Sequence, residues 1–182
     1  DLLIDSSASQ IKRQHIVADQ AYIIAKAMDE VGIPIRIMGF STLRNHTVFT
    51  LYRDYNEKQN NLNIYNFFAA GSNRDGFAFK TLHEIIDTNE DTKNLVIILS
   101  DGKPNDEKSN INTSKLKSKD QYTGLNAIND TALEIRNLKS DDVSVLGVFT
   151  GDEKDVENAK LIYNKDFVRI TNLENFSKIV SI

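Results

Sequence analysis

Three polar clusters in this sequence carry side-chain oxygens that suit a metal ion. They occupy residues 5–9 (DSSAS), residues 72–76 (SNRDG) and residues 100–106 (SDGKPND), and none of them contains a histidine. Carboxylate, hydroxyl and amide oxygens are hard ligands, which favour Mg²⁺, Mn²⁺ or Ca²⁺ and disfavour zinc. The clusters therefore predict a site for a hard divalent cation, with Mg²⁺ as the first expectation.

The candidate ligands come from all three clusters. Asp5 and Asp101 supply carboxylates, and the hydroxyls of Ser7 and Ser9 face the same way if their segment is extended. Mg²⁺ takes about six ligands and keeps some waters, so about three protein ligands leave one position for a carboxylate from a partner protein. The predicted metal ligands are Asp5, Ser7, Ser9, Asn73, Asp75 and Asp101.

Each cluster taken alone also has a simpler interpretation. Ser9 lies just before an expected helix, where it is equally consistent with an N-cap. Residues 100–106 contain Gly and Pro, which favour a turn. Residues 5–9 and 100–106 together indicate a metal site more specifically than either does alone, because each directly follows an apolar run. We expect Asp106 to be a turn or outer residue, and Asp130 to lie on a helix surface.

Apolar patterning predicts strands and helices that alternate along the whole chain. Strands are expected at residues 2–4, 33–40, 47–53, 94–99, 143–149 and 167–170. Helices are expected at residues 11–31, 56–70, 124–139, 152–163 and 173–180, with another after Gly76 that carries Ala78, Leu82, Ile85 and Ile86. Residues 107–123 are rich in Lys, Ser, Asn and Asp and are expected to form an exposed, mobile loop.

This alternation predicts an α/β fold: a Rossmann-like, doubly wound, mostly parallel six-stranded sheet with helices on both faces. Only about six residues separate the second and third strands, too few for a parallel crossover, so one antiparallel strand should lie at the sheet edge. Ligands of such sheets bind beyond the carboxyl ends of the strands. The first and third clusters therefore converge if their strands are neighbours. One domain is expected over residues 1–182.

Composition narrows the class of protein. The 182 residues are 40% hydrophobic and 26% charged, with a net charge of −4, which favours a packed domain and argues against nucleic-acid binding. The chain has no cysteine, which excludes disulfides and fits a reducing, cytoplasmic location. No apolar run approaches the length of a membrane span. The chain opens at Asp1 within an apolar run, so we expect it to be a fragment of a longer protein.

Residues 5–9 match the Asp-x-Ser-x-Ser signature of the metal-ion-dependent adhesion site (MIDAS) in von Willebrand factor A (vWA) domains, and residues 99–102 (LSDG) resemble the second acidic motif of that family. The resemblance implies that Ser7 and Ser9 bind the metal directly, and that the two acids bind directly or through water. The family has a threonine three residues before a glycine in the middle cluster. Asn73 stands there in this sequence, and Asp75 is the other candidate.

A narrower resemblance involves two bacterial subfamilies. Residues 100–106 look like the Asp-Gly-x-Pro-x-Asp stretch of nitric oxide reductase activation proteins (NorD type) and CobT-type cobaltochelatase subunits. Residues 73–78 (NRDGFA) resemble the CobT type, whereas residues 38–41 (MGFS) and 129–131 (NDT) resemble the NorD type. The resemblance implies a MoxR-class AAA+ ATPase as partner, in the activation of a target enzyme or in metal insertion.

The expected function is a divalent-cation-dependent protein-binding module rather than an enzyme, with a partner that offers an Asp or Glu carboxylate. A metal-dependent hydrolase is one alternative, since a cation in a polar crevice can activate water. However, the sequence contains no Gly-x-Ser-x-Gly elbow and no phosphate-binding P-loop. An extracellular vWA adhesin is the other alternative, because it would use the same site.

Overall fold

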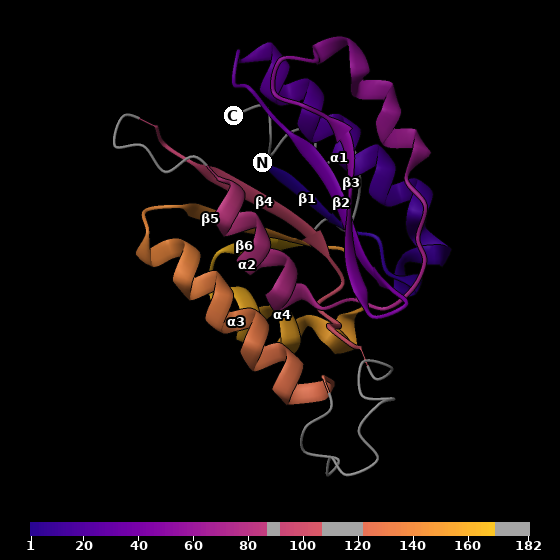
Figure 1. Cartoon of the computed structure of the whole chain (residues 1–182), viewed down its shortest axis with the longest axis vertical. Coiled ribbons are helices and arrows are strands. Elements are labelled where there is room, and N and C mark those ends of the chain that lie inside the picture. The colour runs from indigo at the N-terminus through magenta and orange to yellow at the C-terminus, as the bar shows by residue number, and fades with distance from the viewer. Residues whose placement is uncertain (87–91, 107–121, 170–182) are drawn as a thin grey trace.

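A six-stranded sheet organises the computed structural model, which describes residues 1–86, 92–106 and 122–169 (Figure 1). The strands lie in the order β3-β2-β1-β4-β5-β6. Their bounds are β1 Leu2–Asp5, β2 Ile37–Leu43, β3 His46–Arg53, β4 Leu95–Ser100, β5 Ser144–Phe149 and β6 Phe167–Arg169. The helices are α1 Gln14–Glu30, α2 Asp75–Ile85, α3 Gly124–Ser140 and α4 Val156–Tyr163, with 3₁₀ segments η1 Ala8–Arg13, η2 Lys58–Asn66 and η5 Glu153–Asp155.

The strand pairing confirms the predicted fold class. β1 pairs in parallel with both β2 and β4, and β5 pairs in parallel with β4 and β6. Only β3, at the edge, runs antiparallel to its neighbour β2. β1 and β4 are neighbours although a hairpin, two α-helices and two 3₁₀ segments separate them along the chain. The strand order reverses at this pair, which is where sheets of this kind place their sites.

Two hydrophobic clusters pack the helices against opposite faces of the sheet. Helices α2, α3 and α4 cover one face, with Leu3, Phe40 and Ile98 of the strands beneath them. Helix α1 and η2 cover the other face, over Ile4 and Leu99. Successive residues of a strand point to opposite faces, so β1 and β4 contribute apolar side chains to both clusters. The sheet is therefore a doubly covered and rigid platform for the loops that follow its strands.

The hairpin is tighter than predicted. β2 begins at Ile37 and continues to Leu43, and only Arg44 and Asn45 connect it to β3. Both of these residues have positive φ angles, 50° and 66°, as a two-residue hairpin turn with the right twist requires. The prediction of a strand from residue 33 was wrong, because Pro34 has no N–H to donate to a neighbouring strand. Polar residues after Phe40 pair with β3, which extends the strand.

Several helical predictions were wrong in detail. The region of residues 56–70 forms the 3₁₀ segment η2 rather than an α-helix, and Phe68 is exposed instead of facing inward. Val31, Ile85 and Leu125 fit the apolar spacing of their predicted helices but are also exposed. Each of these three lies at or next to a helix end, where the buried stripe runs past the last packed turn. Residues 11–13 belong to η1, so α1 begins at Gln14.

Some predictions fall outside the described residues. These are the helix at residues 173–180, residue 170 of the last strand and residues 107–121 of the predicted loop. Tyr122, from the end of that loop, is described and is half-buried, with its main chain bonded to Asp106. None of the helices in the described part of the chain combines the length and the apolar character needed to cross a bilayer.

Candidate metal centre

The loops after β1 and β4 meet at the carboxyl edge of the sheet. Asp5 is the last residue of β1, and Asp101 directly follows Ser100, the last residue of β4. Since the two strands are parallel neighbours, both acids leave the sheet at the same edge. Both are fully buried. The structure thus brings the first and third clusters together, as their order along the chain led us to expect.

The first loop presents its two serine hydroxyls side by side. The Ser7 N–H donates to Asp5 Oδ1 at 2.9 Å, which fixes the bend after β1. Ser7 has an extended backbone, and its Oγ lies 2.9 Å from the Oγ of Ser9. The capping interpretation of Ser9 was wrong, because Ser7 precedes η1 and makes no side-chain capping bond. Ser7 is buried, whereas Ser9 is exposed at the surface.

The middle loop reaches the same edge through Asn73. Its main chain pairs with Asn105 in an isolated antiparallel bridge. Its side-chain NH₂ donates to Asp75 Oδ1 at 2.7 Å and faces Asp5 Oδ2 at 3.4 Å. Its side-chain oxygen accepts the Asn105 N–H at 3.2 Å. In this arrangement Asn73 is a donor to the two acids, and Asp75, the first residue of α2, carries the carboxylate of this loop.

The buried acids repel one another. Burial and, after it, the charge of Asp101 raise the pKa of Asp5 to about 7, although hydrogen bonds from Ser7 and Gln10 act in the opposite direction. Burial also raises the pKa of Asp75 well above its usual value, followed by the charges of Asp5 and Asp101. Collecting three carboxylates away from water is costly unless a cation balances them. The cluster is therefore electrostatically suited to a bound cation.

The side-chain oxygens at this edge also suit a hard divalent cation. Asp75 Oδ2 and Asp101 Oδ2 are buried and have no hydrogen-bond partner within the described part of the chain. Buried carboxylate oxygens of this kind need a donor or a metal ion. Among the described residues, no three His, Cys, Asp or Glu side chains alone form a metal-binding group. The serine hydroxyls are therefore essential to any cation site here, and the set consists of oxygens throughout.

Three supporting residues were missed from the sequence. Gln10 is fully buried and directs its amide nitrogen at Asp5 Oδ2 at 3.4 Å and at Thr150 Oγ1 at 3.2 Å. Ser100 Oγ lies 3.5 Å from Asp5 Oδ2 and accepts the Gly102 N–H at 3.1 Å. Ser100 was visible within its motif, but nothing in the sequence marked Gln10 or Thr150. Their role depends on a contact across 140 residues.

Two acids outside the ligand set support neighbouring loops. Asp106 is buried, accepts the Ser72 hydroxyl at 2.8 Å and lies 3.6 Å from Arg74 Nε. Asp130 is half-buried rather than freely exposed. A Cβ on Gly76 would stand only 2.0 Å from Asp130 Oδ2, which is too close for a side chain at this position. Gly76 is thus required for α3 to approach the start of α2.

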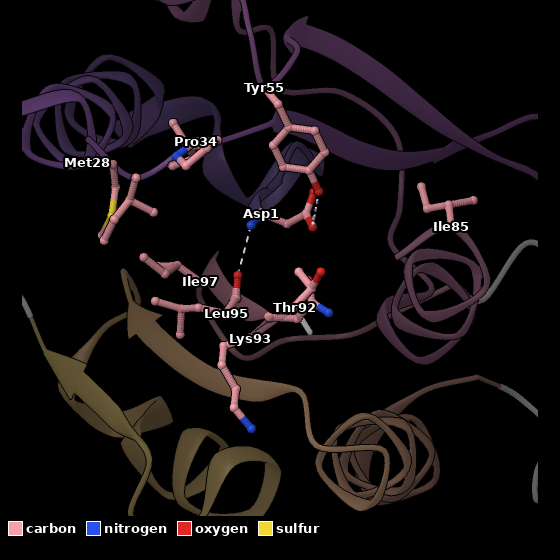
Figure 2. Close-up of a pocket in the computed structure, with 12 residues that line it drawn as sticks. Asp1, Met28, Pro34, Tyr55, Ile85, Thr92, Lys93, Leu95 and Ile97 are labelled. Atoms are coloured by element: carbon pink, nitrogen blue, oxygen red, sulfur yellow. Dashed lines mark hydrogen bonds between the residues drawn. The ribbon is translucent and has the colours of Figure 1, made fainter. Parts of the chain in front are cut away.

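A hollow lies at the opposite, amino edge of the sheet (Figure 2). It has a volume of about 340 Å³ and a mostly apolar lining that includes Met28, Pro34 and Ile97. Its polar part is the Asp1 carboxylate, which accepts the Tyr55 hydroxyl at 2.8 Å and Arg36 Nε at 2.6 Å. None of the predicted ligands lines it. The carboxyl edge is therefore the candidate functional site.

No family model matches this chain, and no curated protein matches it in sequence. Solved structures match it in fold. The pilus adhesin SpaC from Lactobacillus rhamnosus GG covers 98% of this chain at a TM-score of 0.67 and 14% identity. The vWF domain of the type V pili tip protein Mfa5 from Porphyromonas gingivalis covers 98% at a TM-score of 0.68 and 12% identity. The fold is that of a von Willebrand factor A domain.

A third structure with this vWA fold contains a metal. Proximal thread matrix protein 1 from the mussel byssus, with a zinc-occupied MIDAS motif, covers 99% of this chain at a TM-score of 0.61 and 15% identity. This chain spans 28% of SpaC, 92% of the Mfa5 domain and 43% of the byssus protein. At these identities the likeness concerns the fold. Neither the NorD-type nor the CobT-type resemblance finds support among these neighbours.

Proposed function

We propose that this vWA domain is a binding module that holds a divalent cation at its carboxyl edge and uses it to bind a carboxylate of a partner protein. The single observation that supports this most strongly is the pair of serine hydroxyls, 2.9 Å apart, beside buried carboxylates of which Asp75 Oδ2 and Asp101 Oδ2 have no donor among the described residues. Ser7 and Ser9 would bind the cation directly, with Asp5 and Asp101 as the balancing acids. The cation would supply Lewis acidity toward a carboxylate.

Asp75 is the better candidate than Asn73 for the ligand from the middle loop. The Asn73 side-chain oxygen is occupied by the Asn105 N–H, and its nitrogen cannot bind a cation while it donates to two acids. Asp75 has one oxygen without a donor. We assign Mg²⁺ as the expected metal and Mn²⁺ or Ca²⁺ as substitutes, because every donor is an oxygen.

Exposed apolar side chains around the site favour a macromolecular partner. Ile11 follows the serine loop, Phe68 precedes the segment whose Ala70 N–H bonds to the Ser6 carbonyl, and Phe77 lies in the first turn of α2. These three side chains, the apolar rim, are 55%, 71% and 52% exposed. An interface of this kind combines apolar contacts with one polar anchor. A protein segment with an acidic residue next to bulky apolar ones fits both parts.

The first test is calorimetric titration of the full chain with Mg²⁺, Mn²⁺, Ca²⁺ and Zn²⁺. We expect binding of the first three, and Ser7→Ala with Ser9→Ala should abolish it. Ser6→Ala is the matched control, because the Ser6 hydroxyl bonds to the Ile4 carbonyl, away from the two serines. Selective zinc binding, or cation binding that survives the loss of both serines, would show that the ligand set is wrong.

The second test concerns the partner. Peptides with a central Asp or Glu, arrayed beside matched Asn or Gln peptides, should capture the Mn²⁺-loaded chain and release it on chelation. Capture that persists in chelator would contradict the metal bridge. Turnover of a phosphoester that disappears in Asp101→Asn would instead identify the alternative function, a metal-dependent hydrolase.

An adhesin is the second candidate, since the structural neighbours include a pilus adhesin and a pili tip protein. The finer proposal from the sequence motifs is a cytoplasmic domain that acts with a MoxR-class AAA+ ATPase. It rests on residues 100–106 and 73–78 alone. The two differ in where the parent protein resides, so fractionation of cells followed by detection of the chain distinguishes them. Binding to a purified MoxR-class ATPase that requires Ser7 would favour the second.

A further inference from the structure

A tyrosine hydroxyl is buried against the sheet near its carboxyl edge, with no hydrogen-bond partner among the described residues. Tyr163, the last residue of α4, is 1% exposed, and its Oη has no hydrogen-bond partner within the described part of the chain. A buried hydroxyl without a partner costs free energy and needs a reason. Phenylalanine would fill the same space without this cost, so the oxygen at this position calls for a function.

The ring of Tyr163 packs on β5 at Gly147. A Cβ on Gly147 would stand 2.7–2.9 Å from three ring atoms, so the glycine leaves the space that the ring fills. Gly147 in β5 pairs with Ile98 in β4, two residues before Ser100 at the strand end. The ring therefore rests one pleat below the edge at which the acids gather.

Asp5 and Ser100 point to the same face of the sheet as Tyr163. Leu3, Ile98 and Tyr163 belong to one hydrophobic cluster. Side chains alternate along a strand, so Asp5 lies on the face of Leu3 and Ser100 on the face of Ile98. Burial raises the pKa of Tyr163 well above its usual value, the charges of Asp75 and Asp5 raise it further, and the Ser100 hydroxyl lowers it. Tyr163 therefore packs on the face of the sheet to which the side chains of Asp5 and Ser100 also point.

Asp75 offers the matching acceptor. Its Oδ1 accepts the Asn73 amide, but its Oδ2 is buried and has no donor within the described residues. The hydroxyl of Tyr163 lacks an acceptor in the same way. We propose that Tyr163 is a positioning residue of the metal centre, and that its hydroxyl donates to Asp75 Oδ2 when a divalent cation is bound. This inference rests on the proposed function, because it assigns a role within the same site.

A hydrogen bond of this kind fixes the orientation of a carboxylate around a cation. Loss of such an outer donor costs roughly 10- to 100-fold in metal affinity. A merely structural tyrosine would behave differently, since its loss would destabilise the metal-free chain. Because the described residues of the metal-free chain offer the Tyr163 hydroxyl no bond within hydrogen-bond distance, Tyr163→Phe should change the melting temperature little or raise it.

The experiment is calorimetric titration of the full chain with Mn²⁺ and Mg²⁺ in wild type, Tyr163→Phe and Tyr55→Phe. The Tyr163 variant should bind about tenfold more weakly or worse. Tyr55→Phe is the matched control, because it removes a tyrosine-to-carboxylate bond, to Asp1, at the opposite edge of the sheet (Figure 2). It should bind as wild type. Equal affinity of wild type and Tyr163→Phe would overturn the inference.

A double-mutant cycle with Asp75→Asn tests the named acceptor. In the Asp75→Asn background the further change of Tyr163 should have little effect on affinity. An undiminished effect in that background would overturn the assignment. In parallel, Mg²⁺ should shift the near-ultraviolet tyrosine absorption of wild type, and this shift should be missing in Tyr163→Phe. Wild-type chain that binds none of the cations would refute the proposed function itself, whereas binding without any loss in Tyr163→Phe refutes only the role of Tyr163.

Discussion

Asn73 and Asn105 exchange two main-chain hydrogen bonds, each 3.0 Å long, across two loops that are 32 residues apart in sequence. This bridge fastens the middle cluster to the third one, which itself follows β4. The Asn73 side chain extends the link to Asp5 and Asp75. One asparagine therefore holds all three clusters in register, and the arrangement depends on its amide more than on any charged pair.

Asn73→Ala should lower the free energy of unfolding by about 1–3 kcal/mol, because buried acceptors on Asp75 and Asp5 lose their donor. Urea denaturation followed by circular dichroism measures this. Asn129→Ala, on the exposed surface of α3, is the control and should change stability by less than about 0.5 kcal/mol. An unchanged midpoint in Asn73→Ala would mean that the loops are held by their main chains alone.

Asp5 should make the metal-free chain less stable as pH rises. Its pKa is about 7 in the folded chain, against a reference of 3.8, so the folded state binds more protons than the unfolded state between these values. The free energy of unfolding should therefore fall from about pH 4 to about pH 7 and stay low above it. Asp5→Asn should reduce this slope, leaving the part that the raised pKa of Asp75 contributes, and should raise the melting temperature at pH 8. Thermal melts in chelator check both.

Saturating Mg²⁺ should reverse this pH dependence in wild type, because a cation binds the ionised carboxylates and stabilises the folded chain more at higher pH. Asp142→Asn serves as the control, since Asp142 is exposed and its positive φ angle suits asparagine. If the free energy of unfolding of the metal-free wild type rises between pH 5 and pH 7, Asp5 does not destabilise the folded chain as expected.

Arg53 should stabilise the fold without affecting cation binding at the carboxyl edge. Its fully buried guanidinium donates to both oxygens of Asp29, at 3.0 and 2.7 Å, and to Asn61, which ties β3 to α1 and η2. Burial alone would raise the pKa of Asp29, but hydrogen bonds from Arg53 and Asn61 leave it below its usual value. The stability that this ion pair contributes is therefore lost as pH falls through the pKa of Asp29. Arg53→Met should cost about 3 kcal/mol or more.

The measurement for Arg53→Met is urea denaturation at pH 7 and at pH 4, with metal titration of the folded variant. The penalty should shrink at the lower pH, while Mn²⁺ affinity should match wild type because Arg53 lies at the amino edge. Weakened Mn²⁺ binding in a fully folded variant would show that the two edges are coupled.

The apolar rim should matter for the partner and not for the cation. Phe68→Ser removes a side chain that is 71% exposed, so it should leave Mn²⁺ affinity and folding unchanged while weakening capture by acidic peptides about tenfold. Leu62→Ser is the matched control, because Leu62 is 67% exposed on η2. Equal losses in both variants would indicate general stickiness instead of a defined contact.

Residues 107–121 should be dispensable for the fold and for cation binding. The main chains of Asp106 and Tyr122 already pair, with the Asp106 N–H donating to the Tyr122 carbonyl at 2.8 Å. An Asn-Gly turn in place of residues 107–121 suits such a pair. The shorter connection should raise the free energy of unfolding by about 1 kcal/mol through loop closure. Loss of Mn²⁺ binding in this folded variant would show that the segment contributes to the site.

The fold and the meeting of the three clusters could be predicted because both follow from local patterns. The apolar runs before Asp5 and Asp101 mark two strands, and parallel strands end at one edge. Side-chain direction could not be read in the same way. Asn73 was expected to offer its oxygen to a metal, yet its partner Asn105 comes from a distant loop. Gln10 and Tyr163 escaped notice because their burial depends on Thr150 and Gly147.

Because β1 and β4 are joined by their ladder of hydrogen bonds, the spacing between the loops after them cannot widen without tearing the sheet. The segment of residues 72–76 belongs to no strand of the sheet and is held by loop contacts, among them the Asn73 bridge, the Ser72 contacts to Thr42 and Asp106, and the Gly76 N–H bond to the Tyr122 hydroxyl. Discrimination between a small cation such as Mg²⁺ and a larger one such as Ca²⁺ must therefore come from this segment. Replacing residues 72–76 with other residues should change the relative affinities for Mg²⁺ and Ca²⁺ while the rest of the domain keeps its structure.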